Sequence, residues 1–86
     1  MTKESIKQIY LDAPTEHLHP SLLKYVEQWS EQPSSLQVLR LLANLQGKAS
    51  AFTLEYTQRL FNKCCQDDGR HPEEVAAEYQ KELQNP

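Results

Sequence analysis

The sequence has little of what forms glycine-rich loops, disulfide frameworks or membrane spans. Its 86 residues include two glycines and two cysteines, and two isolated glycines cannot form the loop that holds nucleotide phosphates. No run approaches the ~20 apolar residues that a membrane-spanning helix needs. The N-terminal sequence MTKESIKQIYLDAP lacks the continuous apolar core of a signal peptide. We therefore expect a cytoplasmic protein that does not enter a membrane.

The two cysteines, Cys64 and Cys65, are adjacent. Neighbouring cysteines can pair only through a strained ring, and on a helix their side chains diverge by about 100°. The chain therefore has no internal disulfide framework, which favours a reducing compartment. Both thiols lie near the expected end of a helix, where the helix dipole disfavours a thiolate. We interpret one cysteine as a core residue and the other as half-buried, rather than as nucleophiles.

The spacing of the remaining metal-ligand and acidic residues does not match a known chemical motif. His17 and His19 flank a leucine, and His71 stands apart, whereas zinc sites use Cys-x2-4-Cys or His-x3-5-His spacing. The acidic pairs at 67–68 and 73–74 are typical of a turn and of a first helical turn. We expect no metal site, no cofactor and no enzymatic activity.

Charge is unevenly distributed along the chain. The net charge is -3. Residues 34–66 have four basic and one acidic residue, and residues 67–86 have two basic and six acidic residues. An acidic chain without a long basic run is a poor candidate for general nucleic-acid binding. No run of like charge is long enough to indicate an interaction tail.

The stretch 36–45, LQVLRLLANL, predicts a central helix over about 34–46. Seven of its ten residues are apolar, and they cover most of the circumference, as in a helix surrounded by others. Ser34 and Gln37 have the spacing of a capping box at the start of this helix. Gly47 is well placed to end it in the left-handed conformation.

Three polar residues interrupt this apolar stretch: Gln37, Arg40 and Asn44. Arg40 and Asn44 are one helical turn apart, so they should mark the one side of the helix that escapes burial. We expect Leu39 and Leu42 in the core, where truncation to Ala costs roughly 2–5 kcal/mol.

Helical patterns cover the rest of the chain, and no strand pattern competes with them. The prediction is an all-α fold, a compact bundle of four helices plus a short N-terminal helix, in a single domain spanning 1–86. Residues 1–19 would supply the short helix and a connection, and residues 20–85 the four-helix core. Whether the short helix docks stays open, because an isolated helix of about nine residues is marginal. The expected helices besides the central one are 3–11, 20–32, about 50–66 and 72–84.

The leading functional hypothesis is a small protein-binding module that acts as an adaptor, a regulator or a self-associating subunit. Aromatic residues dominate binding hot spots, and Leu22, Tyr25 and Trp29 give the second helix a face rich in such residues. We predict that these three residues contact another protein, including a second copy of the same chain as a homodimer.

The alternative hypothesis is a nucleic-acid-binding regulator with a hairpin like a helix-turn-helix. The central helix, its glycine turn and the following helix have that order, and Arg40, Lys48, Arg59 and Lys63 supply basic surface. Four cations form a small patch for phosphate binding, and the second helix begins with residues poorly suited to read base edges. Nucleic acid is therefore the less favoured partner.

Overall fold

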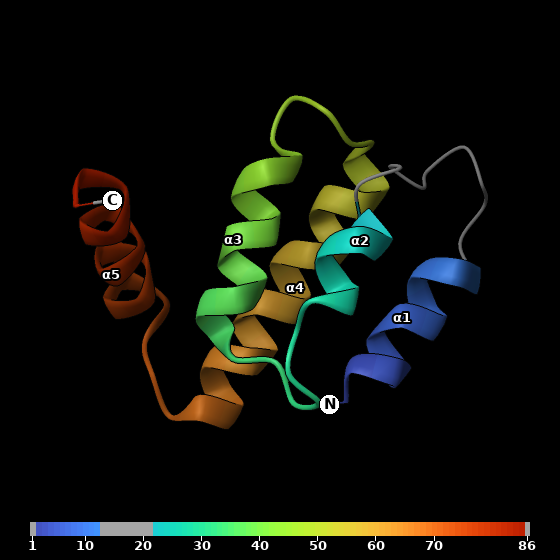
Figure 1. Cartoon of the computed structure of the whole chain (residues 1–86), viewed down its shortest axis with the longest axis horizontal. Helices are drawn as coiled ribbons and strands as arrows, with labels where there is room; N and C mark the ends of the chain where they lie inside the picture. Colours follow the sequence, from blue (N-terminus) through green and yellow to red (C-terminus); the bar gives the residue numbers. More distant parts are fainter. Residues whose placement is uncertain (1, 13–21, 86) are drawn as a thin grey trace.

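The computed structural model describes residues 2–12 and 22–85, which form an all-α bundle as predicted (Figure 1). Within these ranges there is no β-strand. No helix in the described part of the chain is both long enough and apolar enough to cross a membrane. The helices are α1 (Lys3–Asp12), α2 (Leu22–Glu27), α3 (Ser35–Leu45), α4 (Ala51–Asp68) and α5 (Pro72–Gln84).

The central helix α3 begins and ends close to the predicted residues. The Ser34 hydroxyl accepts a hydrogen bond from the Gln37 backbone N–H at 3.3 Å, and the Gln37 side chain accepts one from the Ser34 N–H at 3.0 Å. This reciprocal pair is the predicted capping box. Gly47 follows the helix with a φ of 75°, a conformation that glycine adopts without strain.

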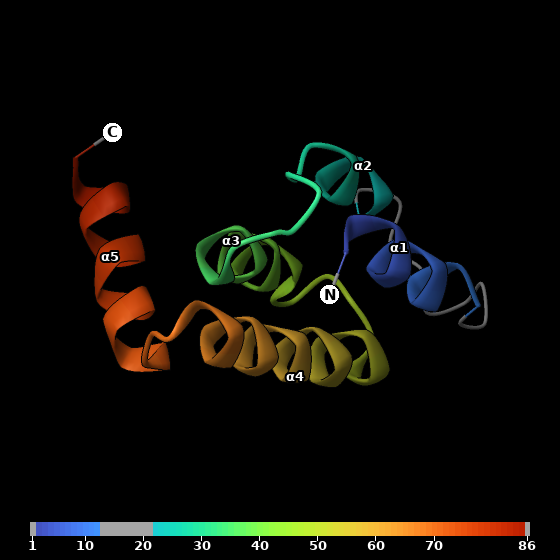
Figure 2. The same cartoon turned by 90° about the horizontal axis from the view of Figure 1, so that it is seen from below.

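α4 runs antiparallel to α3, and the two helices lie side by side in Figures 1 and 2. Ser50 caps the start of α4, and Gly69 ends it in the left-handed conformation. An additional contact joins the helices, because the Asp68 carboxylate accepts a hydrogen bond of 2.7 Å from the Ser35 N–H. A carboxylate is disfavoured at the C-terminal end of a helix and favoured at an N-terminal end. The N-terminus of α3 therefore stabilises the Asp68 carboxylate, which lies at the C-terminal end of α4.

α2 is shorter than the predicted helix over residues 20–32. Pro20, its expected first residue, lies outside the described residues, and the helix ends at Glu27. The backbone then tightens, with the Trp29 N–H bonded to the Val26 carbonyl at 3.1 Å. This turn directs Trp29 into the core, where it is 6% exposed. The helical pattern predicted over residues 28–32 is therefore not realised, and Trp29 is buried from a turn.

The short N-terminal helix α1 docks onto the bundle, which answers the question that its length left open. Ile6 and Tyr10 are buried. The Tyr10 hydroxyl and Thr57 Oγ1 are 2.6 Å apart, and Thr57 Oγ1 donates to the Thr53 carbonyl at 2.7 Å. Since the Thr57 proton is used in this way, Tyr10 donates to Thr57. The Lys3 N–H also donates to the Glu31 carbonyl, at 2.7 Å.

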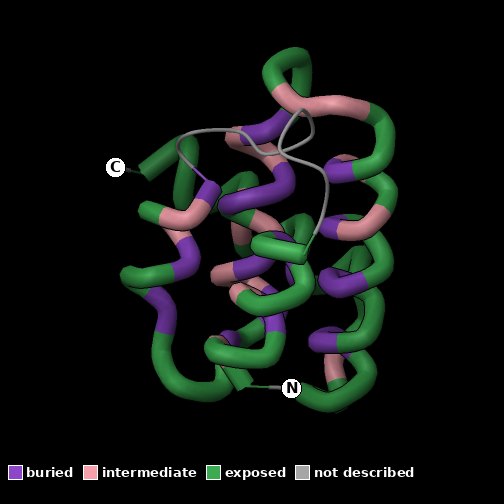
Figure 3. Tube along the Cα trace, turned by 90° about the vertical axis from the view of Figure 1, so that its right-hand side faces the viewer, coloured by how far each residue is buried: buried purple, intermediate pink, exposed green. Residues whose placement is uncertain are grey.

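The core lies mainly between α1, α2, α3 and α4, and its buried positions are the purple segments of the tube in Figure 3. α5 contacts α3 and α4 but buries a single residue, Val75. Its stripe continues outward through exposed Ala76 and half-buried Tyr79 to Leu83, which is 57% exposed. α5 is therefore buried against the bundle only at Val75, and much of its apolar stripe is left uncovered.

Candidate functional site

Two hollows that share lining residues adjoin along α3 and together form a trough. Their volumes are about 490 Å³ and about 130 Å³, and Tyr25 and Arg40 line both. α3 forms the floor, α2 forms one wall and α5 forms the other, and we call this site the α3 trough. Its lining residues are Tyr25, Gln28, Trp29, Gln37, Arg40, Ala43, Asn44, Gln46, Lys48, Tyr79, Glu82 and Leu83.

The floor of the α3 trough is the polar side of α3 that the sequence marks. Gln37, Arg40 and Asn44 recur every three or four residues, so they share one side of the helix. Arg40 is exposed, and Gln37 and Asn44 are half-buried, which confirms that the side of α3 with Arg40 and Asn44 escapes full burial. Ala43 lies beside them, and its small side chain leaves the floor low.

The two walls are partly apolar. Half-buried Tyr25 and the edge of Trp29 belong to the segment that contains α2. Tyr79 and Leu83 belong to α5 and are one helical turn apart. Aromatic and aliphatic side chains thus face each other across a polar floor. This combination is common at protein–protein contacts, where a few large apolar side chains supply most of the binding energy.

Arg40 and Glu82 form an ion pair that connects the floor to the α5 wall. Arg40 Nε donates to one carboxylate oxygen at 2.9 Å, and the terminal guanidinium nitrogen pairs with the other oxygen. The hydrogen bond from Arg40 lowers the pKa of Glu82, and the same bond raises the pKa of Arg40. The ion pair neutralises the charge of Arg40. Lys48, at the end of the same hollow, forms no ion pair with any residue that the structure describes.

Of the three residues predicted to bind protein, Tyr25 and Trp29 line the α3 trough, whereas Leu22 lines neither of its hollows. Leu22 is fully buried, and Trp29 is 6% exposed. In this conformation neither residue presents a surface to a partner. Tyr25 is half-buried and lines both hollows. Of the predicted set, Tyr25 is the residue best placed to contact a partner.

The four basic residues of the alternative hypothesis do not line one surface feature. Arg40 and Lys48 line the α3 trough, and Arg40 is paired with Glu82. Lys63 lines a different hollow, and Arg59 is an exposed residue of α4. The helix-turn-helix arrangement predicted from the sequence order therefore leaves these cations divided between separate sites.

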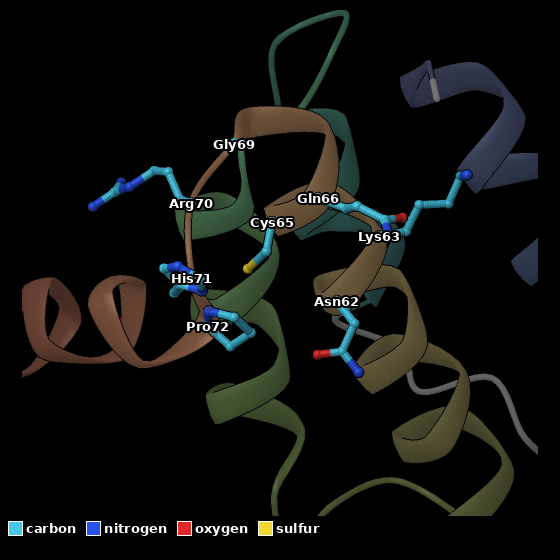
Figure 4. Close-up of a pocket in the computed structure, with 8 residues that line it drawn as sticks. All are labelled: Asn62, Lys63, Cys65, Gln66, Gly69, Arg70, His71 and Pro72. Atoms are coloured by element: carbon cyan, nitrogen blue, oxygen red, sulfur yellow. The ribbon is translucent and has the colours of Figure 1, made fainter.

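A second hollow, of about 520 Å³, lies where α4 meets α5 (Figure 4). In the close-up, the Cys65 side chain points toward His71 and Pro72, whereas Arg70 and Lys63 point away from this group on opposite sides. Arg70 is paired with Glu74 and Glu78 of α5. The cationic groups at this hollow are therefore directed outward and do not converge on a common point.

The cysteines have the properties of core thiols. Both are buried. Burial raises the pKa of Cys64 to about 11, with a smaller contribution from the negative charges of Asp68 and Asp67. Burial also raises the pKa of Cys65, although the neighbouring Ser35 hydroxyl opposes this shift. A thiol with a raised pKa is a weak nucleophile at neutral pH, because little of it is thiolate.

Metal ligands do not gather in the described part of the chain, where no three His, Cys, Asp or Glu side chains are placed to hold an ion. His17 and His19 lie outside the described residues. His71 is the N-cap residue of α5, and its side chain makes no capping hydrogen bond.

The α5 wall of the trough, formed by Tyr79, Glu82 and Leu83, was not predicted from the sequence. Tyr79 and Leu83 fall on a helical stripe that reads as core, and the pattern alone does not show that α3 leaves half of that stripe uncovered. The chain matches no protein-family model, and comparisons with curated proteins and with solved structures found no match. The function must therefore be argued from the geometry of the trough.

Proposed function

We propose that this chain is a non-enzymatic protein-binding module whose contact surface is the α3 trough. The observation that carries the proposal is the uncovered side of α3, flanked by Tyr25 on one wall and by Tyr79 and Leu83 on the other. A helix from another protein that lies over α3 would insert its apolar side chains between these walls, as amphipathic helices do in hydrophobic grooves.

The small size of the chain supports the same proposal. A domain of this length buries only about 60–65% of the surface that its unfolded chain exposes, so its own core gives a thin margin of stability. Binding of a partner to the folded state adds to that margin. The raised pKa values of Cys64 and Cys65 disfavour a thiolate nucleophile at either residue.

A substitution on the floor of the trough tests this proposal. Asn44→Arg places a long side chain in the trough, and arginine is well tolerated in helices. Gln58→Arg is the matched control, because it makes the same charge change at an exposed position of α4. Tagged full-length chain of each type is used to capture proteins from an extract of the native cell, and far-UV circular dichroism verifies that the variants fold.

We expect the wild type and Gln58→Arg to retain the same protein and Asn44→Arg to lose it. Equal capture by all three forms would place the contact elsewhere and contradict the proposal. A wild-type chain that captures no protein and also does not associate with itself would contradict it as well.

A further inference from the structure

α5 offers more apolar and acidic surface than its own chain uses. Val75 faces the bundle and is buried, but Ala76 and Leu83 are exposed and Tyr79 is half-buried. Ala76, Tyr79 and Leu83 recur at i, i+3 and i+7, so they form one stripe along the trough side of α5. This stripe therefore forms a ridge beside the α3 trough.

A ridge next to a groove is self-complementary. A two-fold axis near the middle of α5 would place the α5 helices of two copies antiparallel, with the ridge of each copy against the trough of the other. The exposed Leu83 of one copy then meets the first half of α5 of the second copy, where Ala76 is small enough to let the helices approach closely.

The charges fit the same arrangement. Lys48 lies at the Leu83 end of the trough and has no ion-pair partner among the described residues. Glu73 lies in the first turn of α5, is exposed and is likewise unpaired within residues 2–12 and 22–85. The two ends of α5, Glu73 and Leu83, are separated by about 15 Å of helix. An antiparallel pair therefore brings Glu73 of each copy to the Lys48 end of the other copy.

We propose that the occupant of the α3 trough is a second copy of this chain, which forms a symmetric dimer through antiparallel α5 helices. This inference rests on the proposed function and names its partner. The contact joins Leu83 of each copy to Ala76 of the other, and it pairs Lys48 of each copy with Glu73 of the other. Of the four glutamates of α5, Glu74, Glu78 and Glu82 already form ion pairs among the described residues, which leaves Glu73 to complement Lys48 of the other copy.

Sedimentation equilibrium of the full chain tests the dimer. We expect the mass to rise from 10.0 kDa toward twice that value between about 10 μM and about 1 mM, the range suited to an interface smaller than roughly 1,200 Å². Leu83→Ser and Lys48→Glu should each weaken the association by about tenfold or more, because they remove the apolar anchor and reverse the charge at the trough.

A charge exchange separates a direct contact from a general effect of charge. Lys48→Glu combined with Glu73→Lys restores the opposite pair in each half of the dimer, so the double variant should regain most of the lost affinity. Arg59→Glu is the control, because it makes the same charge change as Lys48→Glu at an exposed position of α4 and should leave the association unchanged.

A chain that stays monomeric at about 1 mM, or a dimer that tolerates Leu83→Ser and Lys48→Glu, would overturn this inference. The proposed function would still stand if Asn44→Arg abolished capture of a different protein by the monomer. Failure of both experiments would exclude the α3 trough as a protein contact of either kind.

Discussion

At the scale of single residues, Tyr10 attaches the N-terminal helix through a buried chain of hydroxyl groups. Tyr10 donates to Thr57, 47 positions away, and Thr57 donates to the Thr53 carbonyl. Burial raises the pKa of Tyr10 far above its ordinary value, so the phenol stays protonated and can donate. The periodicity of residues 3–11 predicts the helix, but no local pattern relates Tyr10 to Thr57.

The Tyr10–Thr57 contact can be measured with a double-mutant cycle. Tyr10→Phe should lower the free energy of unfolding by about 1 kcal/mol, and Thr57→Val by about 1–3 kcal/mol because it leaves the Tyr10 hydroxyl buried without an acceptor. The double variant should lose less than the sum, because no unpaired hydroxyl remains. Urea unfolding measures all three values, and strict additivity would show that the two side chains do not interact.

Cys64 makes the free energy of unfolding depend on pH in the alkaline range. Its pKa is raised by burial from 9.0 to about 11 in the folded chain. The folded state therefore favours the neutral thiol. The stabilisation is fully present below pH 9 and is lost as the pH rises toward 11.

Between about pH 8 and pH 10, this single group should reduce the free energy of unfolding by about 1 kcal/mol. The measurement is urea unfolding of the wild type and of Cys64→Ala at both pH values. Between the two pH values, the free energy of unfolding of Cys64→Ala should decrease by about 1 kcal/mol less than that of the wild type. An identical decrease in the two proteins would mean that Cys64 does not carry the pH dependence.

At the scale of helices, α3 and α5 show which helix ends can be predicted from local sequence. The Ser34–Gln37 capping box, the Gly47 turn and the start of α5 at Pro72 are local features, and the structure confirms each of them. The end of α2 at Glu27 could not be predicted from local features, because residues 28–32 contain no glycine or proline that would end a helix.

The two leucines that the sequence places equally in the core differ in the structure. Leu42 is buried at 6% exposure, whereas Leu39 is half-buried. Leu42→Ala should therefore lower the free energy of unfolding by roughly 2–5 kcal/mol, and Leu39→Ala by clearly less, because the cost follows the contacts that are lost. Thermal and urea unfolding of the two variants compare them directly, and an equal loss at both positions would contradict the burial difference.

At the scale of the whole molecule, the α3 trough arises from three helices whose relative placement the sequence does not reveal. Arg40 and Asn44 are identifiable as the exposed side of α3, and Tyr25 as a surface aromatic. Tyr79, Glu82 and Leu83 join them only because α5 stands beside α3, on the opposite side from α2 (Figure 1). An amphipathic stripe predicts that one face of a helix is buried. It does not show whether the surface that packs on that face belongs to the same chain or to another.

We propose that the uncovered side of α3 is a protein contact and that a second copy of the chain fills it. An isotope-filtered NOE measurement tests this claim most directly, on an equal mixture of ¹³C-labelled and unlabelled full-length chain at about 1 mM. We expect intermolecular cross-peaks between the Leu83 methyl groups of one copy and the Ala76 methyl group of the other. A spectrum without such cross-peaks, or with intermolecular cross-peaks only from the exposed side of α4, would contradict it.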